Sequence, residues 1–167
     1  MTGKNNPVPG LVAPAVVLVT PSYWDEACKH LTKRDRVLKK LIPKFGEARL
    51  QSRGDAFTTL ARSIVGQQIS VKAAQSVWLR FIALFDNKLQ NLAPGSVLAL
   101  EIEAMRGAGL SARKVEYLRD LAKHFADDAV HEAAWSDMDD EAIIDELVAI
   151  RGIGRWTAEM FLIFHLM

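Results

Sequence analysis

The chain has 167 residues, half of them hydrophobic and a quarter charged, with a formal net charge of +1. This is the composition of a soluble globular protein of one or two small domains, long enough to bury a real core. A single cysteine, Cys28, excludes an internal disulfide and a cysteine-ligated cluster or zinc site, and fits a reducing intracellular compartment such as the cytoplasm. The four histidines show no metal-ligand spacing: His30, His124, His131 and His165.

Residues 1–21 contain four prolines and two glycines, which predicts an irregular or extended arm. Its apolar run, Leu11 to Val19, is short, is interrupted by Pro14 and follows only one lysine. We therefore expect neither a signal peptide nor a membrane-spanning helix here, and no membrane partner.

Residues 22–54 predict two helices that pack on the rest of the protein. Ser22 is a candidate cap for the first helix, and Asp35 for the second. The spacing of apolar residues predicts one inward face in each helix. In the first helix this face holds Trp24, Ala27, Cys28 and Leu31, and in the second Val37, Leu38, Leu41 and Ile42.

Residues 55–167 predict the main domain. Helices are expected over 55–69, 71–85, 94–105, 111–125 and 140–150, with Ser70 and Ser111 as caps. No stretch reads as a strand, so the predicted fold is all-α, with about eight to ten helices. The predicted core includes Phe57, Leu60, Ile64, Val77, Trp78, Phe81, Val115, Leu118, Leu121 and Trp135.

Charge is unevenly distributed along the chain. Lys29 to Arg53 holds nine Lys and Arg against two acidic residues, whereas Asp127 to Glu146 holds nine Asp and Glu and no Lys or Arg. One face is then basic enough for a polyanion while another repels it, or both are simply solvated; charge alone leaves the two interpretations open.

The last stretch, Leu147 to Met167, predicts two helices joined by a tight turn. Asp139 or Asp140 can cap the first, which must stop near Ile150 because Gly152 and Gly154 favour a turn. Ile153 between the glycines is expected to fill the contact between the helices. The second helix starts at about Arg155.

Such a turn can bind an anion, because the N–H groups of Gly154, Arg155 and Trp156 begin a helix and lack partners within it. Two other breaks, Gly66 to Ser70 and Gly107 to Ser111, also place glycine and a hydroxyl beside a helix start. The alternative is that all three are corners without a ligand, since a short glycine motif is a weak signal.

Three blocks in order resemble the 3-methyladenine DNA glycosylase II family of the helix-hairpin-helix DNA glycosylase superfamily. The blocks are Phe57 to Ala74 around Ile-Val-Gly-Gln-Gln-Ile-Ser, Gly109 to Ala122 around Gly-Leu-Ser-x-x-Lys, and Leu147 to Ala158 around Gly-Ile-Gly-Arg-Trp-Thr-Ala. Together they lie within Asp55 to Met167, about two-thirds of the chain.

The resemblance implies an enzyme, expected to be a monomer, that flips alkylated purines such as 3-methyladenine out of double-stranded DNA and removes them. By position, Gln67 would line the base pocket and Gln68 would fill the gap left in the base stack. The expected contacts to the DNA backbone come from Ser70, Ser111, Lys114, Gly152, Gly154, Arg155 and Thr157.

Trp156 is the most informative position. An indole face attracts the positive charge of an alkylated base, by about 0.5–2 kcal/mol. Related glycosylase-lyases carry a lysine here that attacks the sugar, and tryptophan cannot form that Schiff base. The expected enzyme is therefore monofunctional, without strand cleavage.

The resemblance also implies a monovalent cation, Na⁺ or K⁺, held by the main-chain carbonyls of Val148, Ile150 and Gly152, and no cofactor for the chemistry. Arg151 stands where the family often has proline. The family's catalytic aspartate lies after the second hairpin helix, beyond Met167. We therefore expect the C-terminal part of the fold to be missing and these 167 residues alone to be inactive.

Three alternatives remain open from the sequence. The first is a non-catalytic helix-hairpin-helix module that contacts only the DNA backbone. The second is a glycosylase-lyase with an iron–sulfur cluster, which Trp156 opposes. The third is a helical scaffold that binds no nucleic acid.

Overall fold

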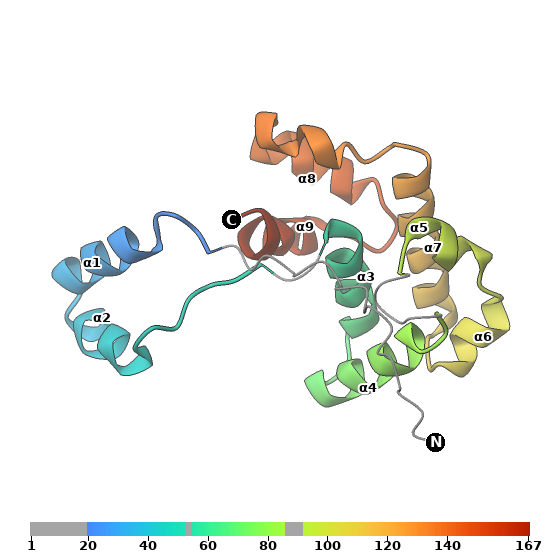
Figure 1. Cartoon of the computed structure of the whole chain (residues 1–167), viewed down its shortest axis with the longest axis horizontal. Helices are drawn as coiled ribbons and strands as arrows, with labels where there is room; N and C mark the ends of the chain where they lie inside the picture. The colour runs from blue at the N-terminus through green and yellow to red at the C-terminus, as the bar shows by residue number, and fades with distance from the viewer. Residues whose placement is uncertain (1–19, 53–54, 86–91) are drawn as a thin grey trace, which may run out of the picture.

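A computed structural model describes residues 20–52, 55–85 and 92–167. The prediction of an all-α fold is confirmed: these residues form nine α-helices and no strand (Figure 1). The predicted arm lies almost entirely within residues 1–19, outside the described part. No helix in the described ranges has the length and apolar character needed to cross a membrane.

The described residues form short α-helices and a few 3₁₀ and π-helical turns. The α-helices are α1 (Trp24–Arg34), α2 (Arg36–Leu41), α3 (Ala56–Gly66), α4 (Val71–Ile82), α5 (Pro94–Ala99), α6 (Ile102–Gly107), α7 (Ala112–Ala126), α8 (Asp140–Val148) and α9 (Arg155–Phe161). The described residues also form two 3₁₀ turns, η1 (Ile42–Phe45) and η3 (Glu132–Asp137), and a π-helical turn, η4 (Leu162–Leu166).

Polar side chains start most of the longer helices, as the sequence predicts. The Asp35 carboxylate accepts the N–H groups of Val37 and Leu38 at 2.7 and 2.8 Å, and Asp139 accepts that of Ala142 at 2.8 Å. Each such bond satisfies an amide that the helix itself leaves without an acceptor. The Ser22 prediction is wrong: Tyr23 precedes α1, and no side chain caps it.

The core lies between α3, α4, α7, α8 and α9. The apolar faces predicted for α3 and α7 are confirmed, and Leu118 and Leu121 of α7 are fully buried against α3. Edge-to-face aromatic contacts join distant segments, since the ring centroids of Phe57 and Phe125 lie 5.4 Å apart. The predicted anchor Trp135 is also buried, 5.4 Å from Phe161 of α9.

The Glu146 carboxylate of α8 forms hydrogen bonds that link this helix to η3 and the residue before it. It accepts hydrogen bonds from the Trp135 indole at 2.6 Å and the His131 main chain at 3.2 Å, and it also pairs with the His131 ring. The acidic stretch is therefore partly structural, because this carboxylate holds the loop that leads into α8.

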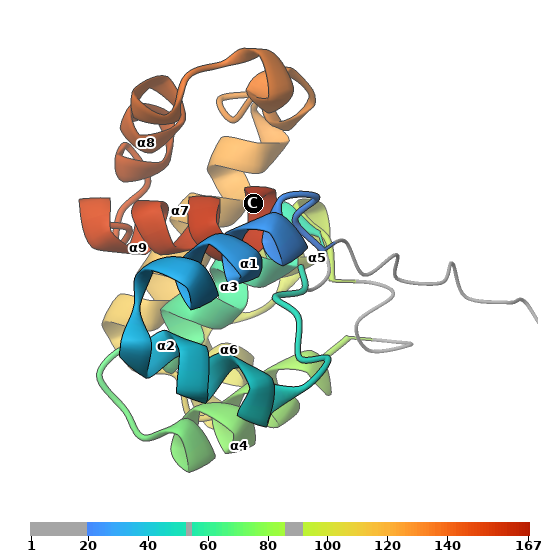
Figure 2. The ribbon, with the colours of Figure 1, turned by 90° about the vertical axis from the view of Figure 1, so that its left-hand side faces the viewer.

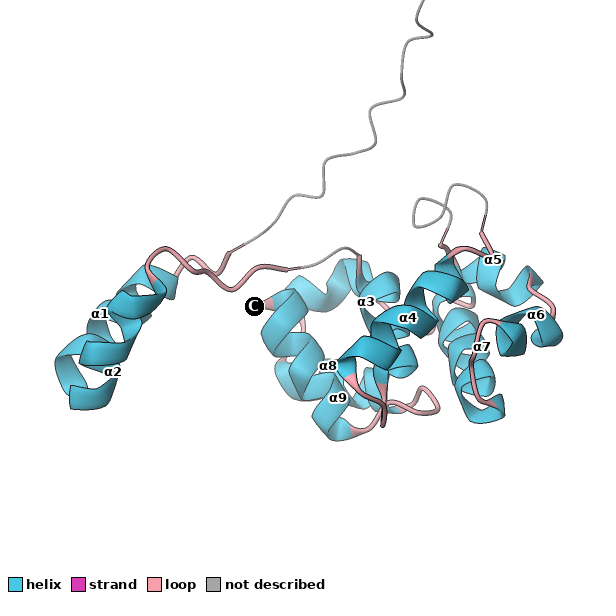
Figure 3. Ribbon diagram, turned by 90° about the horizontal axis from the view of Figure 1, so that it is seen from below, coloured by secondary structure: helices cyan, strands magenta, loops and turns pink. Residues whose placement is uncertain are grey.

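The N-terminal helix pair, α1 with α2 and η1, differs from expectation. It packs on itself instead of on the core, and none of its residues is buried (Figures 1 and 3). Val37, predicted to point inward, is 69% exposed. From the side, α1 and α2 stand in front of α3, α4 and α9 (Figure 2). A two-helix unit of this length is too small to enclose a core of its own.

Candidate nucleic-acid interface

The glycine turn, Gly152 to Gly154, joins α8 to α9 and needs a glycine at its first position. Gly152 has φ +88°, and a Cβ there would lie 2.3 Å from the Tyr117 ring of α7. Ile153 is buried beside it, as predicted, and its N–H donates to the Ile150 carbonyl at 3.1 Å. Tight packing against α7 therefore fixes the path of the turn.

Gly154 has a different environment from Gly152. Its φ of −95° is open to any residue, no atom lies within 4 Å of a Cβ built there, and it precedes α9 without a side-chain cap. Arg155 and Trp156 begin α9, so their N–H groups have no acceptor within the helix. The turn thus presents amides at a point where an incoming group meets no side chain, an arrangement suited to a phosphate.

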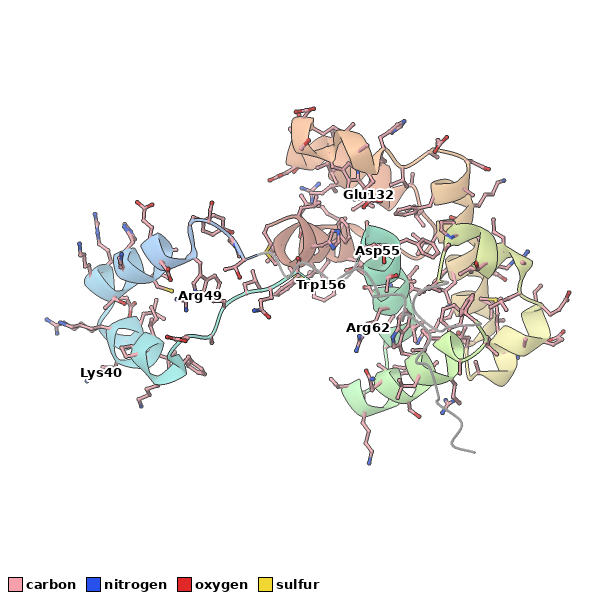
Figure 4. The ribbon with its side chains drawn as sticks, viewed as in Figure 1. Lys40, Arg49, Asp55, Arg62, Glu132 and Trp156 are labelled. Atoms are coloured by element: carbon pink, nitrogen blue, oxygen red, sulfur yellow. The ribbon has the colours of Figure 1, made fainter. Side chains whose placement is uncertain are left out.

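Trp156 lies on the surface at the start of α9, with 71% of the residue exposed, on the side of the core nearest the helix pair (Figure 4). Close by, a cavity of about 170 Å³ opens between α3 and α9. Its lining is mostly apolar with a few hydroxyls and comprises Thr59, Leu60, Ser63, Thr157, Met160, Phe161 and Phe164. The indole is accessible, and Thr157 faces the cavity, while its N–H donates to the Gly154 carbonyl at 2.9 Å.

The two glutamines of the α3–α4 loop have different environments. Gln67 is half-buried, and its side-chain amide donates to the Gly152 carbonyl at 2.8 Å, which ties the loop to the glycine turn. Gln68 is exposed at the surface, with φ +57°, in the left-handed region that costs a side chain with a Cβ about 1–2 kcal/mol. The loop therefore holds Gln67 against the turn and leaves Gln68 at the surface.

Ser70 and Ser111 both cap helices, as predicted. Their hydroxyls accept the N–H groups of Ala73 and Lys114, each at 3.3 Å, and both serines are exposed. The Lys114 ammonium does not extend into solvent but donates to the Val65 carbonyl at the end of α3, 2.7 Å away. Burial lowers the pKa of Lys114. In this structure it joins α7 to α3.

Carboxylates engage both arginines of the glycine turn. Arg155 makes two hydrogen bonds to Glu141 of α8, at 2.6 and 2.9 Å, and one to Glu159 at 2.9 Å. The bonds to Glu141 hold the pKa of Arg155 above its ordinary value, and the same pairing lowers the pKa of Glu141. Arg151 contacts Glu116 of α7 at 3.3 Å. Each guanidinium is therefore paired with a carboxylate but keeps N–H donors that these bonds do not use.

The carbonyls proposed for a monovalent cation remain compatible with one. Ile150 accepts one hydrogen bond from Ile153, and Gly152 accepts one from Gln67. Because a carbonyl oxygen has two lone pairs, each keeps a site for a cation. Within the described ranges, no group of three or more His, Cys, Asp or Glu is arranged to hold a metal ion.

Three loops from separate parts of the chain are thus joined. Lys114, behind the Gly107–Ser111 break, bonds to the end of α3, and Gln67 of the α3–α4 loop bonds to the glycine turn. The sequence predicted these residues as ligand contacts and did not reveal this linkage. The sequence also did not reveal that the Tyr117 ring packs against Gly152. The spacing of Tyr117 from Lys114 does place these two residues on adjacent turns of one helix.

The comparisons with known proteins agree with this architecture. Residues 61–159 match the HhH-GPD superfamily of base excision DNA repair proteins. DNA-3-methyladenine glycosylase 1 of Schizosaccharomyces pombe is 32% identical over 141 residues, which cover 82% of this chain and 61% of that protein. DNA-3-methyladenine glycosylase of Saccharomyces cerevisiae is 31% identical, over 84% of this chain and 52% of its own length. The chain therefore spans between half and two-thirds of these two curated relatives.

Solved structures give the same match. A DNA-3-methyladenine glycosidase from Bacillus halodurans superimposes with a TM-score of 0.72 at 33% identity, covering 89% of this chain and 67% of that one. The Schizosaccharomyces pombe 3-methyladenine DNA glycosylase, solved in complex with abasic DNA, gives 0.70 at 32% identity, over 84% and 70% of the two chains. The glycine turn, the capped helix starts and the sequence match all agree. This chain therefore belongs to the HhH-GPD superfamily of base excision DNA repair proteins.

Proposed function

We propose that the protein is a base-excision repair glycosylase that removes alkylated purines, such as 3-methyladenine, from double-stranded DNA by hydrolysing the N-glycosidic bond. The observation that carries this proposal is the exposed indole of Trp156 at the first turn of α9, directly after the open backbone at Gly154. The names of the curated relatives support the substrate class.

The geometry suggests a division of work. The amides after Gly154 would bind a phosphate of the DNA backbone, which fixes the strand beside α9. Gln68, at the surface of its loop, would enter the space that a flipped nucleotide leaves in the stack. The flipped base would then lie against Trp156, whose ring attracts a purine that alkylation has made cationic.

The same residue supports chemistry without strand cleavage. A lyase attacks the sugar with an amine and forms a Schiff base, which an indole cannot do. Of the cations near the turn, Arg155 is held by two carboxylates and Lys114 by a carbonyl, and a guanidinium is not a nucleophile. We therefore propose a monofunctional enzyme.

A binding experiment tests the role of Trp156. The protein is titrated with two short duplexes that differ only in 7-methylguanine, a cationic purine, against guanine at one position. Trp156→Ala should reduce the preference for the methylated duplex by about 2- to 30-fold, the range of cation–π energies. Leu79→Ala, which truncates an exposed apolar residue on α4, should leave the preference unchanged.

The outcomes separate the alternatives. Covalent trapping on DNA by borohydride would contradict the monofunctional proposal. Equal affinity of the unaltered protein for both duplexes would support a non-catalytic DNA-binding module instead, and absence of DNA binding would contradict both.

We also propose that a monovalent cation joins the carbonyls of Val148, Ile150 and Gly152 to a DNA phosphate. Sodium or potassium is small enough to reach all three oxygens, whereas tetramethylammonium carries methyl groups in place of ligand sites. DNA affinity should therefore fall when KCl is replaced by tetramethylammonium chloride at equal ionic strength. Equal affinity in both salts would contradict this ion site.

A further inference from the structure

The N-terminal helix pair holds most of the cations that have no partner among the described residues. Elsewhere in those ranges, arginines and lysines mostly engage carboxylates, carbonyls or other side chains, as Arg80 does with the Ala108 carbonyl at 2.9 Å. In the helix pair and the segment that follows it, Arg49 forms an ion pair with Asp25 at 2.8 Å. Seven exposed cations of the pair form no ion pair or side-chain hydrogen bond within the described ranges: Lys29, Lys33, Arg34, Arg36, Lys39, Lys40 and Lys44.

Helix dipoles account for four of these seven. Lys33 and Arg34 end α1, and Lys39 and Lys40 end α2, where the negative end of the helix favours a cation. Lys29 lies in the middle of α1, and Lys44 lies in η1. The charge of Lys29 has no such local cause, whereas Lys44 lies in the last turn of η1, a 3₁₀ helix of only four residues.

Arg36 lies where a cation is unfavourable. It is the first residue of α2, at the positive end of the helix, and no acidic residue occupies that turn. Lys40 follows four positions later, so two like charges also share one face of the short helix. Asp35 caps this end through Oδ1, which accepts two main-chain N–H groups, and among the described residues it forms no ion pair with Arg36.

Unlike the basic helix pair, the glycine turn has its cations paired with carboxylates. Its two arginines pair with Glu116, Glu141 and Glu159, so the side chains at the turn supply no net positive charge. Duplex DNA is densely anionic, and its affinity for proteins depends strongly on the phosphates that cations neutralise. Among the described residues, no ion pair joins the helix pair to the acidic α8.

We propose that the N-terminal helix pair is a second DNA-binding surface, which contacts the phosphate backbone of the same duplex through Arg36, Lys44 and the neighbouring lysines. This inference rests on the proposed function, because it assumes that the glycine turn binds DNA. Figure 4 shows Trp156 on the side of the core nearest the pair, with Arg49 on the inner side of the pair and Lys40 at its outer end. The helix pair therefore stands on the same side of the core as Trp156.

The salt dependence of DNA binding tests this surface. Affinity for an undamaged, fluorescein-labelled duplex is measured over a range of NaCl concentrations for the unaltered protein, for Arg36→Gln with Lys44→Gln, and for Arg106→Gln with Lys123→Gln. The last variant removes the same charge from two exposed cations of the core. We expect the helix-pair variant to reduce the slope of log affinity against log salt by about 2, close to one for each phosphate that is no longer neutralised. The core variant should keep the slope of the unaltered protein.

A second variant separates binding from folding. Arg36→Glu places a negative charge at the positive end of α2, so the helix pair should become more stable, not less. If the helix pair contacts DNA, the same variant should bind DNA more weakly. Thermal melting and DNA titration therefore change in opposite directions.

The results also distinguish this proposal from the proposed function. Equal slopes for all proteins, with binding still weakened by Gly154→Ala, would overturn the helix-pair surface and leave the glycine turn intact. An equal loss of slope in both double variants would mean that only net charge matters, and would overturn it as well. No binding by the unaltered protein would contradict both proposals.

Discussion

At the scale of single residues, the two glycines of the turn have separate roles. Gly152 is required by the fold, since its φ of +88° and the Tyr117 ring leave no room for a methyl group. Gly154 is not required by the fold, because its backbone is ordinary and its surroundings are empty. The sequence treats the two alike, and only the position of Tyr117 distinguishes them.

This difference gives a paired prediction. Gly152→Ala should lower the free energy of unfolding by more than about 2 kcal/mol, because strain at positive φ adds to the clash with the ring. Gly154→Ala should cost less than about 1 kcal/mol, the range for a helix N-cap, yet weaken DNA binding because the methyl group would occupy the proposed phosphate approach. Chemical denaturation and DNA titration of both variants check this. A Gly154→Ala protein with unchanged DNA affinity would contradict the phosphate role.

The residue types at the site could be predicted from the sequence better than their contacts. An exposed Trp156 and a buried Ile153 follow from where each stands relative to the turn. The bond from Gln67 to Gly152 and the ion pairs of Arg155 could not be predicted, because each joins segments that a linear pattern does not bring together. Side-chain partners of this kind depend on how helices pack.

At the scale of elements, periodicity is a good guide only where a helix has a neighbour. The apolar faces of α3 and α7 are buried as predicted, because each helix packs in the core. The similar pattern in α2 does not lead to burial, and Val37 lies in solvent. A hydrophobic stripe indicates that a helix can bury a face, but the contact still requires a partner element.

The connection between η3 and α8 gives the prediction at this scale. The Glu146 side chain is 10% exposed and accepts bonds from the Trp135 indole and His131. Glu146→Ala leaves the buried indole N–H without an acceptor, and should lower the free energy of unfolding by about 1–3 kcal/mol. Urea denaturation measures the loss. Asp145→Ala, one residue earlier on the exposed face of α8, serves as the control and should change stability by less than about 0.5 kcal/mol.

At the scale of the whole molecule, the end of the chain returns to the beginning of the core and makes stability depend on pH. His165 stacks on Phe161, with 4.5 Å between ring centroids, and its Nδ1 lies 3.4 Å from the Thr59 hydroxyl of α3. Burial lowers the pKa of His165 from 6.5, and the nearby Asp55 only partly opposes this. The folded protein therefore favours the neutral ring.

The sign of the effect follows from this shift. At pH values between its lowered pKa and 6.5, His165 binds more protons in the unfolded protein than in the folded one. Its contribution to the free energy of unfolding is therefore complete above pH 6.5 and is lost as the pH falls below 6.5. His165→Gln should flatten that part of the melting-temperature profile. An unchanged profile in this variant would contradict the account.

The pKa shift of Glu132 has the opposite effect on how stability depends on pH. Burial and then Asp55 raise the pKa of its carboxyl above 4.5, so its contribution to stability is lost as pH rises through the raised pKa. Glu132→Gln should therefore raise the melting temperature at pH 7, where the native carboxylate is charged, and have little effect at pH 4. Melting curves at the two pH values measure this, and a variant that melts lower at pH 7 would refute it.

The links between Lys114 and Val65, and between Gln67 and Gly152, have a consequence for the thermodynamics of recognition. Loops that hydrogen bonds already join in the free protein have lost most of their conformational entropy during folding. Little further ordering of the protein is then needed when a DNA strand binds. Calorimetry on a nicked or already distorted duplex, where the nucleic acid too needs little rearrangement, should then give an entropy of association with only a small unfavourable conformational contribution from the protein.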